Sequence, residues 1–412
     1  MTPPAQGGGA GQPPGAAALR RLVGDRAATF GSDVWDRTLL LTRAERLPRS
    51  FADLLDAAAV DELVSRRGLR TPFLRVAKDG TTLADRAFTA GGGVGAGVTD
   101  QVSDDALVRL FADGATLVLQ GLHRLWPPII GFSQDLAGEL GHPVQVNAYV
   151  TPPQSRGFSD HYDVHDVFVL QIEGEKRWTI HAPVHPSPLR SQPWTDRRGD
   201  VEAAARAEPV LDEVLRPGDC LYLPRGYLHA ATALGGVSTH VTIGVHGWTR
   251  HALAEQLLAV ALDHLGEDEE VRGALPLGVD VADAAGLAVD LEVVRARLLR
   301  AVQEAPVSEV AGRMETRHRT SQRAAPVGPL AQLRTATDPG DAVLTLRPHL
   351  AARLETQADG SGVLRSRAGD LRLGAREVAA VEGVLEGRPT TAGELGGDLA
   401  RRLLLAGVVV AG

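Results

Sequence analysis

The sequence predicts an α+β protein in which a barrel of short β-strands follows one helical region and precedes another. From Val144 onward, short apolar segments alternate with turns, and most segments are bounded by glycine or proline. Many short strands separated by turns are typical of a barrel or a sandwich. The expected strands cover residues 144–150, 164–172, 176–181, 212–215, 220–223, 229–233 and 238–246. Helical periodicity in the segments before and after this region adds the α part of the α+β class.

The segment in front of the barrel begins with a low-complexity stretch. Residues 1–16 are rich in glycine, proline and alanine, so they offer little to bury and are expected to be disordered. A helical pattern follows directly, and residues 38–41 resemble a strand. Ser50 is expected to cap a further helix that carries Leu54 and Leu55 on one face.

Three more elements lead into the barrel. Ser103 is a good N-cap residue, and its helix is expected to run to about Ala112. Residues 116–119 are apolar and predict a buried strand. The helix predicted over residues 127–140 begins with proline, which is favoured in the first helical turn.

The region after Trp248 is helical at first. Residues 250–264 and 287–304 each place apolar side chains on one stripe, and no strand pattern separates them. These stripes fit either packing within the chain or contact with a second copy. Residues 313–340 are basic and loop-like.

The C-terminal pattern of short strands and two helices is winged-helix-like. The expected elements are strands at 342–346, 362–365 and 371–373, helices at 375–386 and 398–406, and a small final strand. A winged helix often binds DNA. The last helix carries only Arg401 and Arg402 as basic residues, without interleaved aromatics, so a packing or protein-contact role is favoured.

Composition restricts the class of protein. The chain has 412 residues, enough for two or three domains, and its net charge of −8 is not that of a nucleic-acid-binding protein. The single cysteine, Cys220, excludes an internal disulfide and fits a reducing cytoplasm. No segment resembles a signal peptide, and no apolar run reaches the about 18 residues of a membrane helix. We therefore expect a cytoplasmic protein that neither enters a membrane nor binds nucleic acid directly.

Three side chains of the barrel region form a candidate metal site. His161 and Asp163 are two residues apart, so on a strand both side chains point to the same face. Residues 216–229 show a turn, a short apolar strand, a second turn and then His229. Two imidazoles and one carboxylate are the ligand set of non-haem Fe(II) oxygenases. The whole pattern predicts a cupin barrel that holds a metal ion, with His240 as the alternative third ligand.

A lysine near these residues is a candidate anion-binding group. Alternation places Lys176 and Trp178 on one face of a strand expected after a turn at Gly174, whereas Arg177 faces outward. A buried lysine needs an anionic partner, and a dicarboxylate supplies one. The alternative is a solvated hairpin lysine. His165, if its strand is regular, shares the face of the candidate ligands and would line a substrate groove.

These motifs resemble the JmjC-type ribosomal oxygenases, which are Fe(II)- and 2-oxoglutarate-dependent hydroxylases of ribosomal proteins. The resemblance is dense over about residues 25–250 and thinner beyond. It is carried by Asn147-Ala-Tyr149, Thr151-Pro-Pro153, Gly157-Phe158, His161-Tyr-Asp163 and the run from Phe168 to Trp178.

The resemblance implies roles for six residues. His161, Asp163 and His229 would bind the catalytic Fe(II), and Lys176 would pair with the far carboxylate of 2-oxoglutarate. Asn147 and Tyr149 share a strand face and would line the cosubstrate pocket; the residues alone equally allow a tyrosine whose hydroxyl bonds to backbone. Near Gly244, some relatives carry a serine that helps to hold the cosubstrate, which glycine cannot do.

The resemblance also implies a domain organisation and an activity. It predicts a JmjC/cupin oxygenase domain with a double-stranded β-helix over residues 17–249, a helical dimerisation module over 250–312 and a winged-helix-like domain over 313–412. The expected enzyme is a homodimeric dioxygenase that uses Fe(II), 2-oxoglutarate and O2 to hydroxylate a histidine or arginine of a ribosomal protein. The alternatives are an oxygenase of a peptide or small metabolite, and a non-catalytic cupin-like binding protein.

Overall fold

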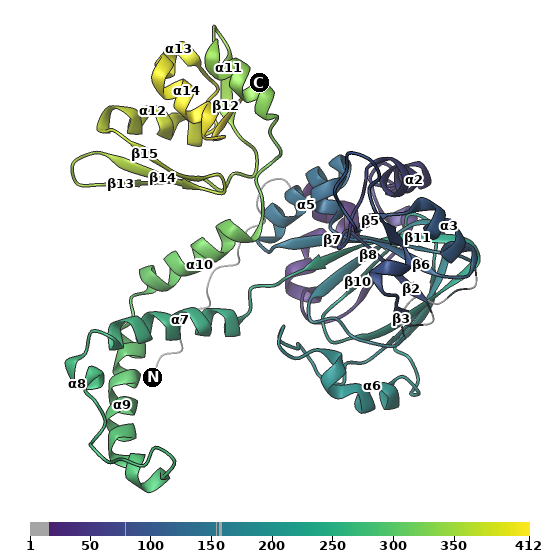
Figure 1. Cartoon of the computed structure of the whole chain (residues 1–412), viewed down its shortest axis with the longest axis horizontal. Helices are drawn as coiled ribbons and strands as arrows, with labels where there is room; N and C mark the ends of the chain where they lie inside the picture. Colours follow the sequence, from purple (N-terminus) through teal and green to yellow (C-terminus); the bar gives the residue numbers. More distant parts are fainter. Residues whose placement is uncertain (1–15, 79, 154, 156–158) are drawn as a thin grey trace. The chain divides into compact units, whose positions relative to one another are not determined.

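A computed structural model describes residues 16–78, 80–153, 155 and 159–412. The chain divides into two compact units, Met1–Gly247 and Trp248–Gly412, which are described separately (Figure 1). Residues 1–15 of the segment expected to be disordered lie outside the described part. Among the described residues, no helix combines the length and the apolar character that a membrane crossing requires.

The first unit is built on a nine-stranded antiparallel sheet that forms the predicted barrel. The strands follow in the order β1 (Leu40–Thr42), β10 (Cys220–Leu223), β8 (Asp166–His181), β11 (Leu228–Val245), β7 (Val144–Thr151), β6 (Thr116–Leu119), β2 (Leu74–Lys78) and β3 (Thr81–Thr82), and β9 (Leu211–Leu215) pairs with β8. Strands β6 and β10 have the predicted bounds. Cys220 on β10 is buried, and burial raises the pKa of its thiol, so it is an inert core residue.

Two long strands run through both halves of the barrel. One half of β8 pairs with β10, the other half pairs with β9, and β11 pairs with both halves. The predicted turn at Gly174 is therefore wrong. Gly174 has a φ of 63°, and a Cβ there would lie 2.1 Å from the carbonyl oxygen of Val237. Glycine thus allows β8 to bend against β11 without ending.

Helices surround the strands of the first unit (Figure 1). They are α1 (Ala17–Val23), α2 (Ala57–Arg66), α3 (Asp104–Ala112), α4 (Leu122–Leu125) and α5 (Pro127–Leu140). Ser103 caps α3 as predicted, because its hydroxyl accepts a hydrogen bond from the Ala106 amide. The prediction for Ser50 is wrong: Asp56 caps α2, and Leu54 and Leu55 are buried in front of that helix.

The segment between β8 and β9 folds onto the barrel wall. This segment, residues 183–210, contains a 3-10 turn, η5 (Trp194–Arg197), and helix α6 (Arg198–Ala204). Val201 of α6 packs with Tyr162 and Leu228 in a small core of its own. The Tyr162 hydroxyl also donates to the Gln192 carbonyl oxygen at 3.1 Å. These contacts anchor the residue between His161 and Asp163.

The second unit begins with helices and ends with small sheets. Its helices are α7 (Arg250–Leu265), α8 (Glu269–Arg272), α9 (Ala284–Glu304), α10 (Val307–Ser321), α11 (Pro329–Thr337), α12 (Ala375–Leu385), α13 (Ala392–Leu395) and α14 (Gly397–Leu405). Its strands are β12 (Val343–Leu346), β13 (Arg353–Thr356), β14 (Gly362–Ser366), β15 (Gly369–Leu373), β16 (Thr390–Thr391) and β17 (Val409–Ala411). The loop predicted over residues 313–340 is wrong, because α10 and α11 occupy most of it. Its basic residues pair with acids, as Arg317 does with Glu255.

Candidate metal centre

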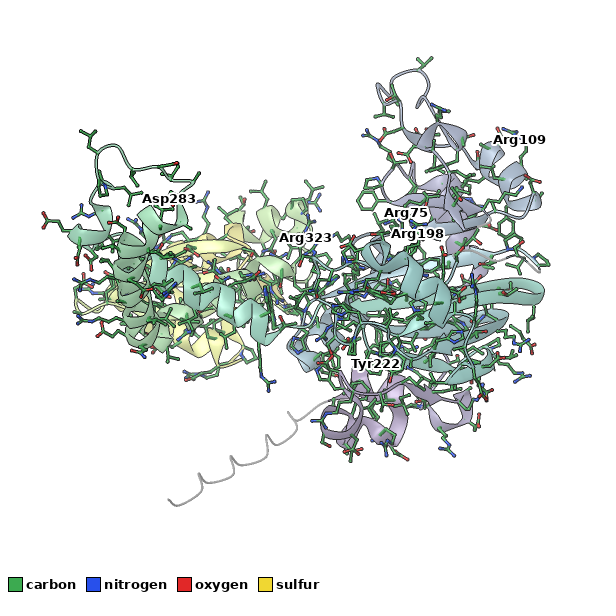
Figure 2. The ribbon with its side chains drawn as sticks, turned by 90° about the horizontal axis from the view of Figure 1, so that it is seen from below. Arg75, Arg109, Arg198, Tyr222, Asp283 and Arg323 are labelled. Carbon is green, nitrogen blue, oxygen red and sulfur yellow. The ribbon has the colours of Figure 1, made fainter. Side chains whose placement is uncertain are left out.

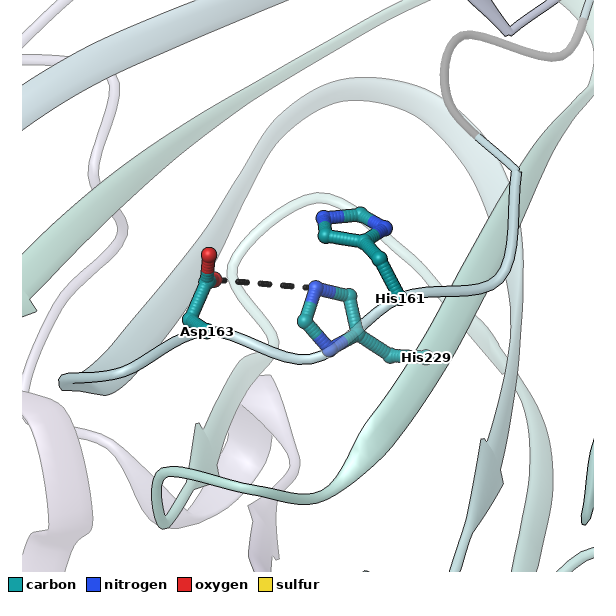
Figure 3. Close-up of side chains that lie close together, drawn as sticks. All are labelled: His161, Asp163 and His229. Atoms are coloured by element: carbon teal, nitrogen blue, oxygen red, sulfur yellow. Dashed lines mark ion pairs between the residues drawn. The ribbon is translucent and has the colours of Figure 1, made fainter. Parts of the chain in front are cut away.

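The structure brings the three predicted metal ligands together in the first unit (Figure 3). Each of His161, Asp163 and His229 offers one ligating atom, and these atoms lie within 4.8 Å of one another. Nε2 of His229 lies 3.7 Å from Oδ2 of Asp163, and the two imidazole centroids are 4.4 Å apart. Two imidazole nitrogens and one carboxylate oxygen at this spacing match the ligand set of non-haem Fe(II) oxygenases, in which two histidines and one carboxylate occupy one face of the metal ion.

Backbone pairing between two short segments produces this geometry. The His229 amide donates to the His161 carbonyl oxygen at 2.9 Å, and the His161 amide donates to the His229 carbonyl oxygen at 3.3 Å. The Gly226 amide donates to the Asp163 carbonyl oxygen at 3.0 Å. The expectation that His161 and Asp163 lie on a regular strand is wrong: they precede β8, and His161 forms only an isolated bridge. Pairing across the barrel holds them extended.

The second nitrogen of each imidazole is held by a backbone carbonyl. Nδ1 of His161 lies 2.8 Å from the Ser159 carbonyl oxygen, and Nδ1 of His229 lies 3.1 Å from the Tyr227 carbonyl oxygen. A carbonyl oxygen only accepts, so Nδ1 carries the proton in both rings. The lone pairs of both Nε2 atoms are therefore available for a metal ion.

The electrostatics of the cluster favour the metal-binding protonation states. Burial, together with the positive charge of His161, lowers the pKa of His229 to about 4, so this imidazole is neutral at physiological pH. Burial opposes ionisation of Asp163, yet the surrounding histidines, His165 and His229 foremost, hold the pKa of Asp163 below its usual value. A neutral His229 imidazole and an ionised Asp163 carboxylate are the forms that bind a divalent cation.

The cluster opens into a cavity of about 200 Å³ inside the barrel. Lys176 and Trp178 on β8 face this cavity, whereas Arg177 faces solvent and pairs with Asp212, as alternation predicted. The Lys176 Nζ donates to the Thr151 hydroxyl at 3.0 Å and lies 3.5 Å from Nδ1 of His240. The buried Nε1 of Trp178 has no hydrogen-bond partner among the described residues. Trp178 therefore brings a donor without an acceptor to the lining of the cavity.

Lys176 has no counter-ion in the described part of the chain. Its side chain is 3% exposed, and burial lowers its pKa from 10.5 to about 7. A solvated hairpin lysine is thus excluded. A buried amine beside neutral groups is costly unless an anion joins it. Lys176 and Trp178 are therefore candidate donors to an anionic group in this cavity.

Asn147 and Tyr149 of β7 line the same cavity. The Asn147 side-chain oxygen accepts from the Gly121 amide at 3.1 Å, so part of its role is structural. Tyr149 stacks on His240 with ring centroids 4.9 Å apart. Burial, followed by the negative charge of Asp163, raises the pKa of Tyr149 to about 12, which keeps its hydroxyl protonated. His240 lies with Lys176 and Tyr149, outside the cluster of His161, Asp163 and His229.

The space beside Gly244 is filled by His165. A Cβ at residue 244 would lie 2.8 Å from Cε1 of His165 and 3.1 Å from Cγ of Gln145. Gln145 Nε2 lies 3.2 Å from His165 Nε2, and His165 Nδ1 lies 3.2 Å from the Asp166 carbonyl oxygen. Glycine at this position therefore lets an imidazole line the cavity, in agreement with the expected place of His165.

Replacing Gly244 by alanine is expected to lower the free energy of unfolding by about 1–3 kcal/mol, because the new methyl group overlaps the His165 ring. Urea unfolding followed by circular dichroism measures this change. Gly131→Ala is the matched control, since no atom lies within 4 Å of a Cβ at that helical position. In a His165→Ala background most of the loss should disappear, and an undiminished loss there would show that His165 is not the obstacle.

Several cavity residues were not predicted from the sequence. They are Arg75, Thr116, Gln145, Thr242 and, as a hydrogen-bond donor, Trp178. Each comes from a strand whose neighbours are set by long-range pairing: β2 pairs with β6, and β6 pairs with β7. Alternation along a strand predicts which side chains share a face, but it does not predict which strands lie next to each other. The sequence therefore contained no direct signal for these cavity residues.

Comparison with known proteins links the barrel to one domain family. Residues 133–253 match the JmjC domain. The chain is 39% identical over 139 residues to the bifunctional lysine-specific demethylase and histidyl-hydroxylase NO66 of Drosophila persimilis, covering 33% of this chain and 19% of the relative. It is 34% identical over 216 residues to ribosomal oxygenase 1 of Rattus norvegicus, covering 49% and 35%. The chain spans at most 36% of the length of these curated relatives.

Solved structures share the fold along nearly the whole chain. The Escherichia coli ribosomal oxygenase YcfD superposes with a TM-score of 0.55 at 16% identity, over 93% of this chain and 97% of the other. The YcfD complex with cobalt and 2-oxoglutarate gives a TM-score of 0.54 at 15% identity, over 95% and 99%. At this identity the likeness establishes the architecture, a cupin-type barrel followed by helical parts.

Proposed function

We propose that this chain is an Fe(II)- and 2-oxoglutarate-dependent dioxygenase of the JmjC-type ribosomal oxygenases, which the JmjC match over residues 133–253 and the likeness to NO66 and ribosomal oxygenase 1 support. Its proposed reaction is hydroxylation of a histidine or arginine side chain of a ribosomal protein, in the cytoplasm. The main support for the proposal is that the cluster of His161, Asp163 and His229 lines the same cavity as the buried Lys176. A purely structural metal site has no need of an unpaired buried amine.

The proposed cofactor supplies the oxidation: iron with O2 and 2-oxoglutarate inserts one oxygen atom into a C–H bond and yields succinate and CO2. The chain's residues bind and orient. His161, Asp163 and His229 hold the ion on one side and leave its other positions open. Lys176, Trp178 and the Thr151 hydroxyl surround the site for the far carboxylate. Asn147 and Tyr149 line the path between these two ends.

Two experiments test the proposed function in turn. The first measures succinate formed from 2-oxoglutarate by the Fe(II)-loaded chain, and we expect turnover that stops in His161→Ala. Absence of turnover in the wild type would leave only a binding protein. The second compares the masses of ribosomal proteins from cells with and without the gene. We expect an increase of about 16 Da on one protein, and no difference on any would exclude a ribosomal substrate.

Binding of 2-oxoglutarate should take up a proton above neutral pH. Because the pKa of Lys176 is lowered to about 7, its amine is mostly neutral at pH 8. An adjoining carboxylate favours the ammonium form, so close to one proton should enter per cosubstrate at pH 8 and about none at pH 6. Calorimetry in buffers of different ionisation enthalpy, with Zn(II) already bound, gives the proton count. Equal counts at both pH values would contradict the role of Lys176.

We also propose that residues 250–312 form the dimerisation module of a homodimer. Helices α7 and α9 present leucine and valine side chains to solvent in the single chain, and α9 has no buried residue. The exposed side chains are Leu253, Leu258, Leu262, Val289, Leu291 and Leu299. Light scattering after size exclusion should give twice the chain mass, and Leu291→Glu combined with Leu299→Glu should give the monomer. A monomeric wild type would contradict this proposal.

A further inference from the structure

A second cation, Arg75, lines the same cavity as Lys176. Arg75, labelled in Figure 2, lies on β2 between the buried Leu74 and Val76, so alternation turns its side chain to the other face of the sheet, and Arg75 lines the cavity. β2 is next to the last strand of the sheet, and the Arg75 side chain is only partly buried. Arg75 thus lines the cavity from a strand near the edge of the sheet.

Arg75 has no partner in the described chain. No carboxylate pairs with it, and its buried Nε has no hydrogen-bond acceptor among the described residues. Other arginines of the barrel differ: Arg43 pairs with Glu213 and Asp219, and Arg225 pairs with Asp36. An orphan guanidinium beside a cavity needs an acceptor, and the cavity is where a ligand can supply one.

Arg75 and Lys176 serve different places in the cavity. Across the sheet Arg75 aligns with Val118, and Val118 aligns with Tyr149. Burial chiefly raises the pKa of Tyr149, and the positive charge of Arg75 opposes that rise, which places this cation near the tyrosine. Burial alone lowers the pKa of Lys176, whose Nζ faces Thr151 and His240 instead. Arg75 is thus assigned to the side of Tyr149, and Lys176 to the side of His240, the ring on which Tyr149 stacks.

Charge balance leaves Arg75 in excess. In the proposed loaded site, a divalent metal and protonated Lys176 together carry three positive charges, and these equal the three negative charges of Asp163 and the two carboxylates of 2-oxoglutarate. The guanidinium of Arg75 then remains as an uncompensated positive charge beside the reaction site. A group from the substrate is the remaining source of an anion, and a carboxylate matches the forked donor geometry of arginine.

We propose that Arg75 is a substrate-binding residue that receives a carboxylate of the substrate chain, from an aspartate, a glutamate or a chain end close to the residue that is hydroxylated. This inference rests on the proposed function, because it takes the cavity to be loaded with metal and 2-oxoglutarate. It adds a specificity element: an acidic group near the target residue.

A binding experiment on the full chain tests this without turnover. The chain is loaded with Zn(II) and 2-oxoglutarate, and two small probes are titrated by saturation-transfer NMR: N-acetyl-aspartate methylamide and its uncharged match, N-acetyl-asparagine methylamide. We expect the wild type to bind the carboxylate probe about tenfold more tightly or better. Arg75→Met should remove this preference, and Arg75→Lys should keep part of it. Arg109→Met, on the exposed surface of α3, should keep all of it.

Two results would overturn the inference. One is equal binding of both probes by the wild type. The other is a loss of 2-oxoglutarate affinity in both Arg75 variants, because Arg75 would then hold the cosubstrate. Failure of the chain to hydroxylate any protein would refute the proposed function but would leave the probe preference intact, so the two failures can be told apart.

Discussion

Replacing His229 by alanine is expected to abolish metal binding, whereas replacing His240 by alanine is expected to preserve it. His229 completes the cluster with His161 and Asp163, and its Nδ1 is committed to a backbone carbonyl, which leaves Nε2 for the ion. His240 contacts Lys176 and Tyr149 instead. Losing a direct ligand should exceed the about 10–100-fold loss of affinity that follows from changes around a metal site.

The visible absorption of bound Co(II) reports this difference directly. The wild type and His240→Ala should saturate with cobalt at similar concentrations, and His229→Ala should not saturate in the same range. Circular dichroism of each variant shows whether the barrel has folded, so a loss of binding can be assigned to the ligand. Retention of cobalt by His229→Ala together with its loss in His240→Ala would reverse the assignment of the third ligand.

The sequence predicted individual elements where local signals were strong. The bounds of β6, β10 and α5 match the prediction, because short apolar runs or a leading proline define them within the segment itself. The prediction failed at Gly174, where glycine between two apolar runs indicated a turn. Pairing of β8 with β11 keeps the chain extended there, and no local pattern carries that information.

The candidate site shows the same division. His161, Asp163 and His229 were found because their spacing and the turn before His229 lie in short segments. The hydrogen-bond acceptor of Lys176 was not found, since Thr151 reaches it only through the neighbouring positions of β7, β11 and β8. Arg75 depends on two further pairings. Ligands grouped in motifs are thus predictable from sequence, whereas a cavity wall assembled from several strands is not.

Replacing Lys176 by methionine is expected to have opposite effects on cosubstrate binding and on stability. Loss of the ammonium partner of a buried carboxylate should weaken 2-oxoglutarate about 100-fold. The ligand-free protein should become more stable, because methionine fills a similar volume without a buried amine. With the pKa of Lys176 lowered from 10.5 to about 7, the gain at pH 7 is on the order of 4 kcal/mol at most.

The pH dependence of this gain has a definite sign. The folded chain disfavours the protonated amine of Lys176. In the wild type, this residue therefore does not lower the free energy of unfolding above its unfolded pKa. The free energy of unfolding falls as the pH falls toward 7, and it falls no further below the folded pKa. The stability advantage of Lys176→Met should therefore be larger at pH 7 than at pH 10. Urea unfolding at both pH values measures it, and calorimetry with Zn(II) bound measures 2-oxoglutarate affinity.

Arg177→Met, at the neighbouring position, is the control that removes a positive charge from the surface instead of from the barrel interior. Arg177 pairs with Asp212 at the surface, so its loss should change stability by less than about 1 kcal/mol and leave cosubstrate affinity unaltered. If Lys176→Met instead destabilised the ligand-free chain and bound 2-oxoglutarate normally, the amine would be a structural hydrogen-bond donor to Thr151. Greater stability without the ligand, combined with lost affinity for it, is the behaviour of a residue retained for binding.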